Sequence, residues 1–251
     1  TGPGQGMISL GTSGVYFVVA NQFSSFPEKA VHSFCHALPD RWHLMSVMLS
    51  AASCLDWFAK SVVGKDVPAV LSLLENEDGP SENAPFFLPY LSGERTPHND
   101  PNASGAFVGL THQHSTKDMA YAVLEGVCFA MADGVDAVHA SGTIANDICL
   151  IGGGTKSVYW RQMMADILNL KLFYKKGGDV GPALGAARLA QLGTCKNSRV
   201  QDVCGSPPLV DTHHPNAQHH QIYQRRRNVF VSLYPAIQQA VSNLSQTSTE
   251  R

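Results

Sequence analysis

A strand-like run that leads directly into three glycines and then into a helix most restricts what this chain can fold into. Residues 148–151 are apolar, residues 152–154 are all glycine, and Ser157 can cap a helix with one apolar side. Such a turn commonly binds anions and nucleotides, because unpaired N–H groups and the positive end of the helix point at the ligand. A simple connection between a closely packed strand and helix is the alternative. The spacing is neither G-x-G-x-x-G nor Walker A, which argues against a Rossmann or P-loop site.

A second glycine turn lies near the start of the chain. Residues 11–14 read Gly-Thr-Ser-Gly and separate two runs of apolar, β-branched and aromatic residues, which predicts a β-hairpin over residues 7–20. Glycines let N–H groups approach an oxyanion closely, and the two hydroxyls add donors, so this turn could hold a phosphate. Taken alone, the tetrapeptide is more often an ordinary tight turn.

The order of the remaining patterns predicts the fold class. Further strands are predicted at residues 31–37, 42–45, 106–110, 148–151 and 172–174. Helices are predicted at residues 47–60, from residue 66, at 115–139, from 157, at 182–192 and at 217–244, with Pro235 expected to kink or break the last one. Residues 195–216 are predicted to form a loop. A hairpin with further strands, followed by alternating strands and helices, implies an α/β domain with a mixed sheet covered by helices.

Composition excludes several classes of protein. Hydrophobic residues make up 44% of the 251 residues and charged residues 15%, which is typical of a globular protein. The formal net charge is −2, and we interpret the three arginines at residues 225–227 as a solvated helix face rather than a nucleic-acid contact. No run of about 18 apolar residues is present, so we expect no membrane contact. Six cysteines without a C-x-x-C pair predict reduced thiols in a cytoplasmic protein.

Other polar groups are interpreted as structural. Glu94 and Arg95 follow an apolar run, and we predict that they form an ion pair that pins a loop. Four histidines between residues 213 and 220 are predicted to lie in a solvated tail, because no nearby Cys or acid completes a tetrahedral metal site. His36 and His43 lie in apolar surroundings and are interpreted as core histidines. No metal-ligating residue is predicted.

The most specific pattern is Gly-Ala-Phe-Val-Gly-Leu at residues 105–110, followed after seven residues by Asp-Met-Ala-Tyr-Ala-Val-Leu-Glu at residues 118–125. Four further segments stand in a fixed order: the turn at residues 10–14, Leu-Pro-Tyr-Leu-Ser-Gly-Glu-Arg-Thr-Pro at 88–97, the strand–glycine–helix turn, and Gly-Pro-Ala-Leu-Gly-Ala-Ala at 181–187. Together these motifs resemble the FGGY family of carbohydrate kinases. A narrower resemblance, to the bacterial xylulose kinases, is carried by residues 31–37, 41–46, 51–57 and 109–114.

The resemblance implies an actin-like, ribonuclease-H-like ATPase fold, with ATP and Mg²⁺ as cofactors and D-xylulose as the phosphoryl acceptor. The ATP-binding residues that it implies are Gly11, Thr12, Ser13, Gly152, Gly153, Gly154 and Ser157. The first three correspond to the turn that contacts the β- and γ-phosphates. The three consecutive glycines correspond to the turn that contacts adenosine and phosphate, and Ser157 to a position that can reach the adenine.

Members of the family have two domains, and this chain is similar to the second. The resemblance covers residues 7–251, whereas residues 1–6 match nothing, and the N-terminal sugar domain is expected to be absent. Relatives carry the catalytic Asp in a glycine-rich segment just before the first turn, and residues 1–6 contain no Asp. We therefore expect no catalytic residue here, weak ATP binding, and no xylulose phosphorylation by this chain alone.

The implied partners are a nucleotide, a sugar and the missing N-terminal domain. Loss of that domain would expose an apolar cleft face, which favours a homodimer. Two alternatives stay open: a non-catalytic actin-like scaffold, and a kinase of another sugar or polyol, such as ribulose, gluconate or glycerol. A rise in melting temperature on adding ATP and Mg²⁺ would separate the nucleotide-binding interpretation from the scaffold.

Overall fold

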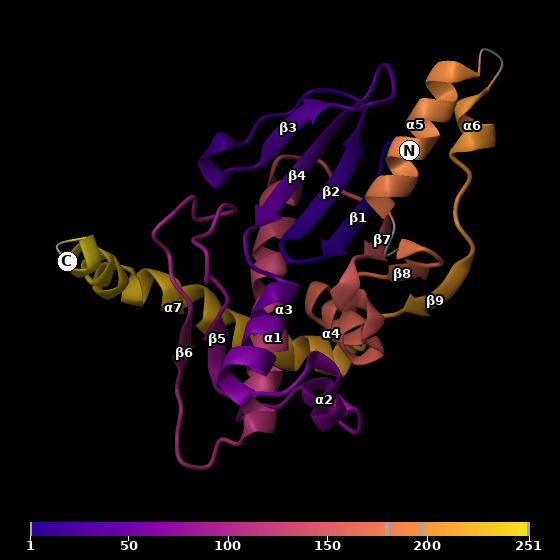
Figure 1. The fold of residues 1–251 in the computed structure, drawn as a ribbon. Helices are drawn as coiled ribbons and strands as arrows, with labels where there is room; N and C mark the ends of the chain where they lie inside the picture. Colours follow the sequence, from indigo (N-terminus) through magenta and orange to yellow (C-terminus); the bar gives the residue numbers. More distant parts are fainter. Residues whose placement is uncertain (1, 179–180, 196–197, 250–251) are drawn as a thin grey trace.

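A seven-stranded mixed sheet dominates the structure, which is a computed structural model describing residues 2–178, 181–195 and 198–249 (Figure 1). Its strand order is β3-β4-β2-β1-β7-β8-β9. The strands are β1 (Gln5–Leu10), β2 (Gly14–Ala20), β3 (His32–Cys35), β4 (Trp42–Met48), β7 (Asp147–Ile151), β8 (Leu172–Lys175) and β9 (Leu209–His213). Strands β1, β7 and β8 run parallel, and the other neighbouring pairs are antiparallel. Thr1 of the segment that matches nothing, and residues 250–251 at the end of the predicted domain, lie outside the described residues.

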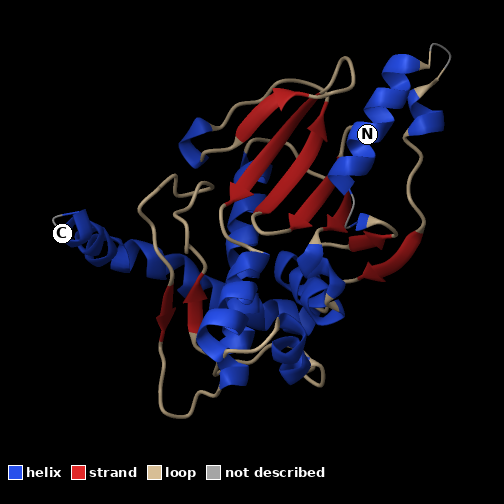
Figure 2. Ribbon diagram, viewed as in Figure 1, coloured by secondary structure: helices blue, strands red, loops and turns tan. Residues whose placement is uncertain are grey.

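One long helix, α3 (Thr116–Ala140), packs across a face of this sheet (Figure 2). Its N-terminus has the predicted capping box, in which Ser115 and Asp118 exchange side-chain and backbone hydrogen bonds. Gly126 lets the helix touch the small two-stranded sheet, because a Cβ there would overlap the carbonyl oxygen of Phe87. The helix is therefore the axis around which both sheets are arranged.

The remaining elements include helices that pack on α3, and the helices α5 and α6, which lie away from it. They are α1 (Ala52–Trp57), which continues as a π-helical stretch (Phe58–Val63), α2 (Val67–Leu71), α4 (Val158–Leu168), α5 (Gly181–Thr194), α6 (Val200–Val203), α7 (Ala217–Thr249) and the small sheet of β5 (Phe86–Leu88) and β6 (Ala106–Val108). Short 3-10 turns occur at Pro27–Lys29, Ser72–Leu74 and Gly153–Lys156. None of these helices is both long and apolar enough to cross a membrane, as far as the described residues go.

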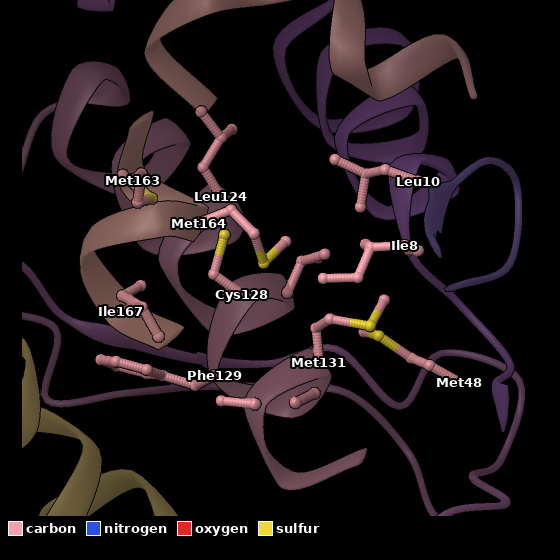
Figure 3. Packing of buried hydrophobic residues seen from close by; sticks show 14 of the residues in the cluster. Ile8, Leu10, Met48, Leu124, Cys128, Phe129, Met131, Met163, Met164 and Ile167 are labelled. Carbon is pink, nitrogen blue, oxygen red and sulfur yellow. The ribbon is translucent and has the colours of Figure 1, made fainter. Parts of the chain in front are cut away.

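The core lies between the sheet and the helices α3 and α4. Side chains from β1, β4, α3 and α4 meet there, among them Ile8, Met48, Leu124, Met131 and Met164 (Figure 3). The six cysteines are not paired with one another, and only Cys54 and Cys128 are fully buried. Burial of this continuous cluster is the main stabilising contribution in a domain of this size.

Most predicted elements are confirmed, but two segments differ. The helix predicted at residues 47–60 is wrong at its start: β4 extends through Met48, where it pairs with Gly14, and α1 begins only at Ala52. Residues 195–216 are not simply a loop, since they include α6 and β9; residues 196 and 197 lie outside the described part. Strand β9 forms because His213 and its neighbours pair with β8 at the sheet edge, a partner that polar composition does not reveal.

The C-terminal helix also departs from expectation. Pro235 lies inside α7 without ending it, and Tyr234 and Gln238 on either side of it both donate to the carboxylate of Asp100. The interpretation of the arginines at residues 225–227 as a solvated helix face is right only for Arg225, whose side chain is 64% exposed. Arg226 is buried, and its guanidinium makes a bidentate pair with Glu125 of α3, at 2.6 and 2.7 Å.

The small-residue helix α5 lies apart from the core. None of its residues is buried. Leu184 and Leu189 stay substantially exposed, with 36% and 44% of their surface accessible. The helix is therefore present where predicted but does not contribute a buried face.

Candidate functional site

The two glycine turns line a single cavity of about 620 Å³. Strands β1 and β7 are parallel neighbours, with Ser9 opposite Ile151, so the turns that follow them leave the same edge of the sheet. Of the predicted site residues, those that line the cavity are Gly11, Thr12, Gly153, Gly154 and Ser157. The other two, Ser13 and Gly152, belong to the same turns but do not line it. The size of the cavity suits a small organic ligand.

The two turns touch each other through Gly152. This residue has φ +95° and ψ 166°, a backbone conformation available essentially only to glycine. A Cβ on it would lie 2.7 Å from the carbonyl carbon of Leu10 and 2.9 Å from the nitrogen of Gly11. Gly152 therefore allows the close approach that makes one site out of two turns.

The first turn is held by the start of α1. The carbonyl oxygen of Gly11 accepts a hydrogen bond from the nitrogen of Ala52 at 2.8 Å. The carbonyl oxygen of Thr12 accepts from the nitrogen of Ala51 at 2.9 Å and from the hydroxyl of Ser53 at 2.7 Å. With its carbonyls occupied in this way, the turn presents the exposed Thr12 side chain to the cavity. Within the described residues, the Thr12 hydroxyl has no hydrogen-bond partner, so it is available to a ligand.

The second turn is held from behind. The nitrogen of Gly152 donates to the carbonyl of Gly178 at 3.2 Å, and the Gly152 carbonyl accepts from the hydroxyl of Thr155 at 2.7 Å. The first N–H groups of a helical turn have no acceptor inside it. Accordingly, no acceptor among the described residues takes the N–H of Gly153 or Gly154. A Cβ on Gly153 would enter open space, so this backbone forms a cradle that a side chain would fill.

Ser157 lies at the N-terminus of α4. Its hydroxyl oxygen accepts a hydrogen bond from the nitrogen of Trp160 at 3.2 Å, which confirms that Ser157 caps the helix. The hydroxyl hydrogen stays free to be donated into the cavity. The Ser157 side chain can therefore cap the helix and contact a ligand at the same time.

The far end of the cavity is apolar, and sequence reasoning missed it. Its wall is made by Leu55 of α1, Trp160 of α4 and three residues of α2: Val67, Pro68 and Leu71. Three helices distant in sequence meet there, and the apolar pattern of each helix alone does not show that they share a cavity. The charged side chains of Asp56 and Lys156 also line the cavity, and Asp56 pairs with Lys60 at 2.7 Å. The site thus combines a polar end rich in N–H donors with an apolar end.

The groups interpreted as structural are only partly as predicted. Glu94 does not pair with Arg95: the carboxylate is buried and accepts from the backbone nitrogens of Leu49 and Arg95, at 3.0 and 2.7 Å, so it pins the loop through the backbone. Burial raises the pKa of the Glu94 carboxyl to about 7. His36 and His43 are half-buried on the outer face of the sheet, and the Nδ1 atom of His43 has no partner in the described chain.

The histidines near residue 213 do not form a solvated tail. His213 is 4% exposed and accepts a hydrogen bond from Arg161, and His219 and His220 both contact Asp166. The polar composition of the segment predicted a solvated tail, whereas the structure has the packed edge strand β9 and the start of α7 there. In the described part of the chain, no group of three His, Cys, Asp or Glu side chains is arranged to hold a metal ion.

The chain matches one protein family and is similar in sequence to bacterial kinases. The model of the C-terminal domain of the FGGY family of carbohydrate kinases matches residues 6–193. Xylulose kinase of Escherichia coli strain K12 is 58% identical over 230 residues, which are 92% of this chain and 47% of that protein. Xylulose kinase of Klebsiella pneumoniae is 53% identical over 95% of this chain and 49% of its own length.

Solved structures give the same result for the fold. The crystal structure described as a xyloylose kinase from Brucella ovis superposes with a TM-score of 0.88 at 39% identity, over 96% of this chain and 49% of that one. The prediction of an actin-like α/β ATPase domain with a mixed sheet is therefore confirmed. The chain spans about half the length of the relatives it matches.

Proposed function

The chain belongs to the FGGY family of carbohydrate kinases, and we propose that it is the ATP-binding half of an enzyme that phosphorylates D-xylulose. The observation that carries this proposal is the single cavity shared by the two glycine turns, with unpaired N–H groups at one end and apolar side chains at the other. The xylulose specificity rests on the relatives alone, since the sugar pocket is proposed to lie mostly in an N-terminal domain outside residues 7–251.

The geometry suggests how a nucleotide would lie. Its phosphates would meet Gly11, Thr12 and Ser13 on one side and the glycines at residues 152–154 on the other. Backbone N–H groups and hydroxyls suit phosphate oxygens, because they donate charge-assisted hydrogen bonds. The base would lie against the apolar side chains of Val67, Pro68 and Leu71, within reach of the Ser157 hydroxyl. The open space beside Gly153 agrees with a phosphate group at that point.

The Mg²⁺ ion is proposed to arrive with the nucleotide. Mg²⁺ keeps several water molecules and is usually bound through substrate phosphates and one or two carboxylates, rather than by a cage of protein ligands. The ion would neutralise charge on the phosphate oxygens during transfer. The residues of this chain would align the nucleotide beneath it through the two turns.

Phosphoryl transfer depends mostly on position and electrostatics. In this proposal the N–H donors of both turns hold the triphosphate and stabilise the negative charge on it. A carboxylate that accepts the proton of the sugar hydroxyl would come from a part of the whole enzyme outside these 251 residues, and closure of the two domains would exclude water. The 251-residue chain alone would therefore bind ATP weakly and transfer no phosphate.

Thermal unfolding of the chain with and without ATP and Mg²⁺ tests the proposal. We expect nucleotide to raise the melting temperature, and Thr12→Val to reduce that rise because a free hydroxyl in the cavity is lost. Thr143→Val is the matched control, since Thr143 lies outside the cavity in the loop after α3. No rise in any of the proteins would favour a scaffold without nucleotide. Xylulose-dependent ADP release by this chain alone would contradict its proposed inactivity.

A further inference from the structure

A buried arginine lies directly behind the second glycine turn. Arg161 of α4 has only 6% of its side chain exposed, and its guanidinium donates in three directions. Its Nε donates to Nε2 of His213 at 2.8 Å, one terminal nitrogen donates to the Thr155 carbonyl at 2.7 Å, and the other donates to the Asp211 carboxylate at 3.1 Å. The guanidinium also stacks over the ring of Tyr174, 4.1 Å from its centre.

Thr155 connects this arginine to the turn. Thr155 is 1% exposed, and its carbonyl oxygen accepts from Arg161. Its nitrogen and hydroxyl both donate to the Gly152 carbonyl, at 3.2 and 2.7 Å. A continuous chain of hydrogen bonds therefore runs from the sheet edge through Arg161 and Thr155 to the backbone whose free N–H groups face the cavity.

The sheet edge forms a rigid seat for the guanidinium. Tyr174 of β8 is paired with Asp211 of β9, and His213 is two residues further along the same strand. Because a guanidinium can only donate, Nε2 of His213 must accept, and its Nδ1 then carries the hydrogen. That hydrogen is directed to the side-chain oxygen of Gln162 at 3.1 Å. Burial lowers the pKa of His213, which favours this neutral, fully bonded state.

Placing a charged group here requires compensation, because a buried cation without partners is strongly unfavourable. Arg161 has an anionic partner, a neutral acceptor, a backbone carbonyl and an aromatic face. The guanidinium itself does not line the cavity, so any effect on a ligand must pass through the turn. Because the guanidinium is planar and carries several N–H donors, the Arg161 side chain of α4 can bond strand β9 and the glycine turn at the same time.

We infer that Arg161 is a positioning residue for the nucleotide turn, holding Gly152, Gly153 and Gly154 in their cradle by fixing the Thr155 carbonyl against the β8–β9 edge. This inference rests on the proposed function for the identity of the ligand, but the clamp on the turn exists without it. Lysine cannot replace the arginine, because a single ammonium cannot span His213, Thr155 and Asp211 with the same geometry.

The test compares two buried arginines in the 251-residue chain. Arg161→Lys removes the fork behind the turn, and Arg226→Lys is the matched control, because Arg226 is equally buried but bonds Glu125, Glu82 and Ala84 away from the cavity. Two quantities are measured for each folded variant: hydrogen–deuterium exchange in peptides covering residues 152–157 without nucleotide, and the Kd for ATP with Mg²⁺ by calorimetry.

We expect Arg161→Lys to speed exchange in residues 152–157. It should also weaken ATP binding about tenfold, because a less fixed turn aligns its N–H donors less well, at about the cost of one ligand hydrogen bond. Arg226→Lys should lower the melting temperature but leave exchange in the turn and the Kd as in the wild type. Asp211→Asn, a milder change at a partly exposed partner, should shift both quantities in the same direction by less and serves if Arg161→Lys does not fold.

The outcomes distinguish the positioning role of Arg161 from the proposed binding of ATP. Unchanged exchange and Kd in Arg161→Lys, or equal changes in Arg226→Lys, would overturn the positioning role. If the wild-type chain binds no ATP, the proposed function fails for this chain, and the exchange of residues 152–157 still decides whether Arg161 holds the turn.

Discussion

Two alanine substitutions at adjacent glycines should have opposite effects, and together they test the geometry of the cradle. Gly152 has a backbone conformation that is open only to glycine, and a Cβ there would press on Leu10 and Gly11. Gly153 has no positive φ, and a Cβ on it would meet nothing within 4 Å. The first position therefore joins the two turns, and the second faces the space that a ligand would fill.

The expected magnitudes follow from these contacts. An alanine in the conformation of Gly152 costs about 1–3 kcal/mol of backbone strain. Overlap at 2.7 Å with the Leu10 carbonyl carbon adds about 1–3 kcal/mol of the kind seen on overpacking. Gly152→Ala should therefore lose about 2–6 kcal/mol of stability, and the lower limit corresponds to about 4–8 °C in melting temperature for a chain of this length. Gly153→Ala should be neutral or gain about 0.4–1 kcal/mol, because it restricts the unfolded chain.

Both variants are assayed by thermal unfolding and by titration with ATP and Mg²⁺. Gly152→Ala should melt earlier, and Gly153→Ala should melt like the wild type but bind nucleotide more weakly, because its methyl group enters the cradle. The reasoning is refuted if Gly152→Ala is as stable as the wild type, since the two turns would then not be in contact. Normal ATP binding by Gly153→Ala would show that phosphate does not occupy the space beside that residue.

Further predictions concern buried and exposed charged groups. The folded-state pKa of Glu94 is raised to about 7 from 4.5. Below pH 4.5 the carboxyl is protonated in both the folded and the unfolded protein, so its ionisation does not affect stability. Once the pH has risen past 7, ionisation lowers the stability of the fold by up to about 3 kcal/mol. Glu94→Gln should therefore be increasingly stabilising relative to the wild type between pH 5 and pH 8 in urea titrations, and a constant difference would count against a neutral carboxyl. Glu125→Gln leaves the Arg226 guanidinium buried without its charged partner and should lose about 3–5 kcal/mol in the same assay. Asp136→Asn, at a carboxylate that is 64% exposed, should lose less than about 1 kcal/mol.

Local features of the sequence predicted much of this molecule. The hairpin, the capping box at Ser115, the cap at Ser157 and the two glycine turns all depend on residues close together in the chain, and each is found where expected. Short-range chemistry, such as a hydroxyl that accepts from a backbone nitrogen three residues on, can be recognised without the fold. The ends of the elements were less certain, as at β4, where pairing with β2 extends a strand into residues with helical composition.

The apolar wall and the arginine clamp could not be predicted in this way. Leu55, Val67 and Trp160 lie on three helices, and only their packing shows that they share a surface. Arg161 meets His213 and Asp211 across some fifty residues, from a segment whose polar composition suggested a loop. Buried polar pairs carry no periodic signal, because their partners are chosen by tertiary contacts rather than by spacing along the chain.

The parallel pairing of β1 with β7 has a consequence for how the protein acquires its site. Residues 11 and 152 can meet only after the polypeptide has closed a loop that includes α3, the small sheet and part of the large one, and contacts of such long separation form late and slowly. A half-folded chain would carry both glycine segments and still have no binding surface. Binding of a fluorescent nucleotide during refolding should therefore report completion of the whole domain, rather than the appearance of its first helices.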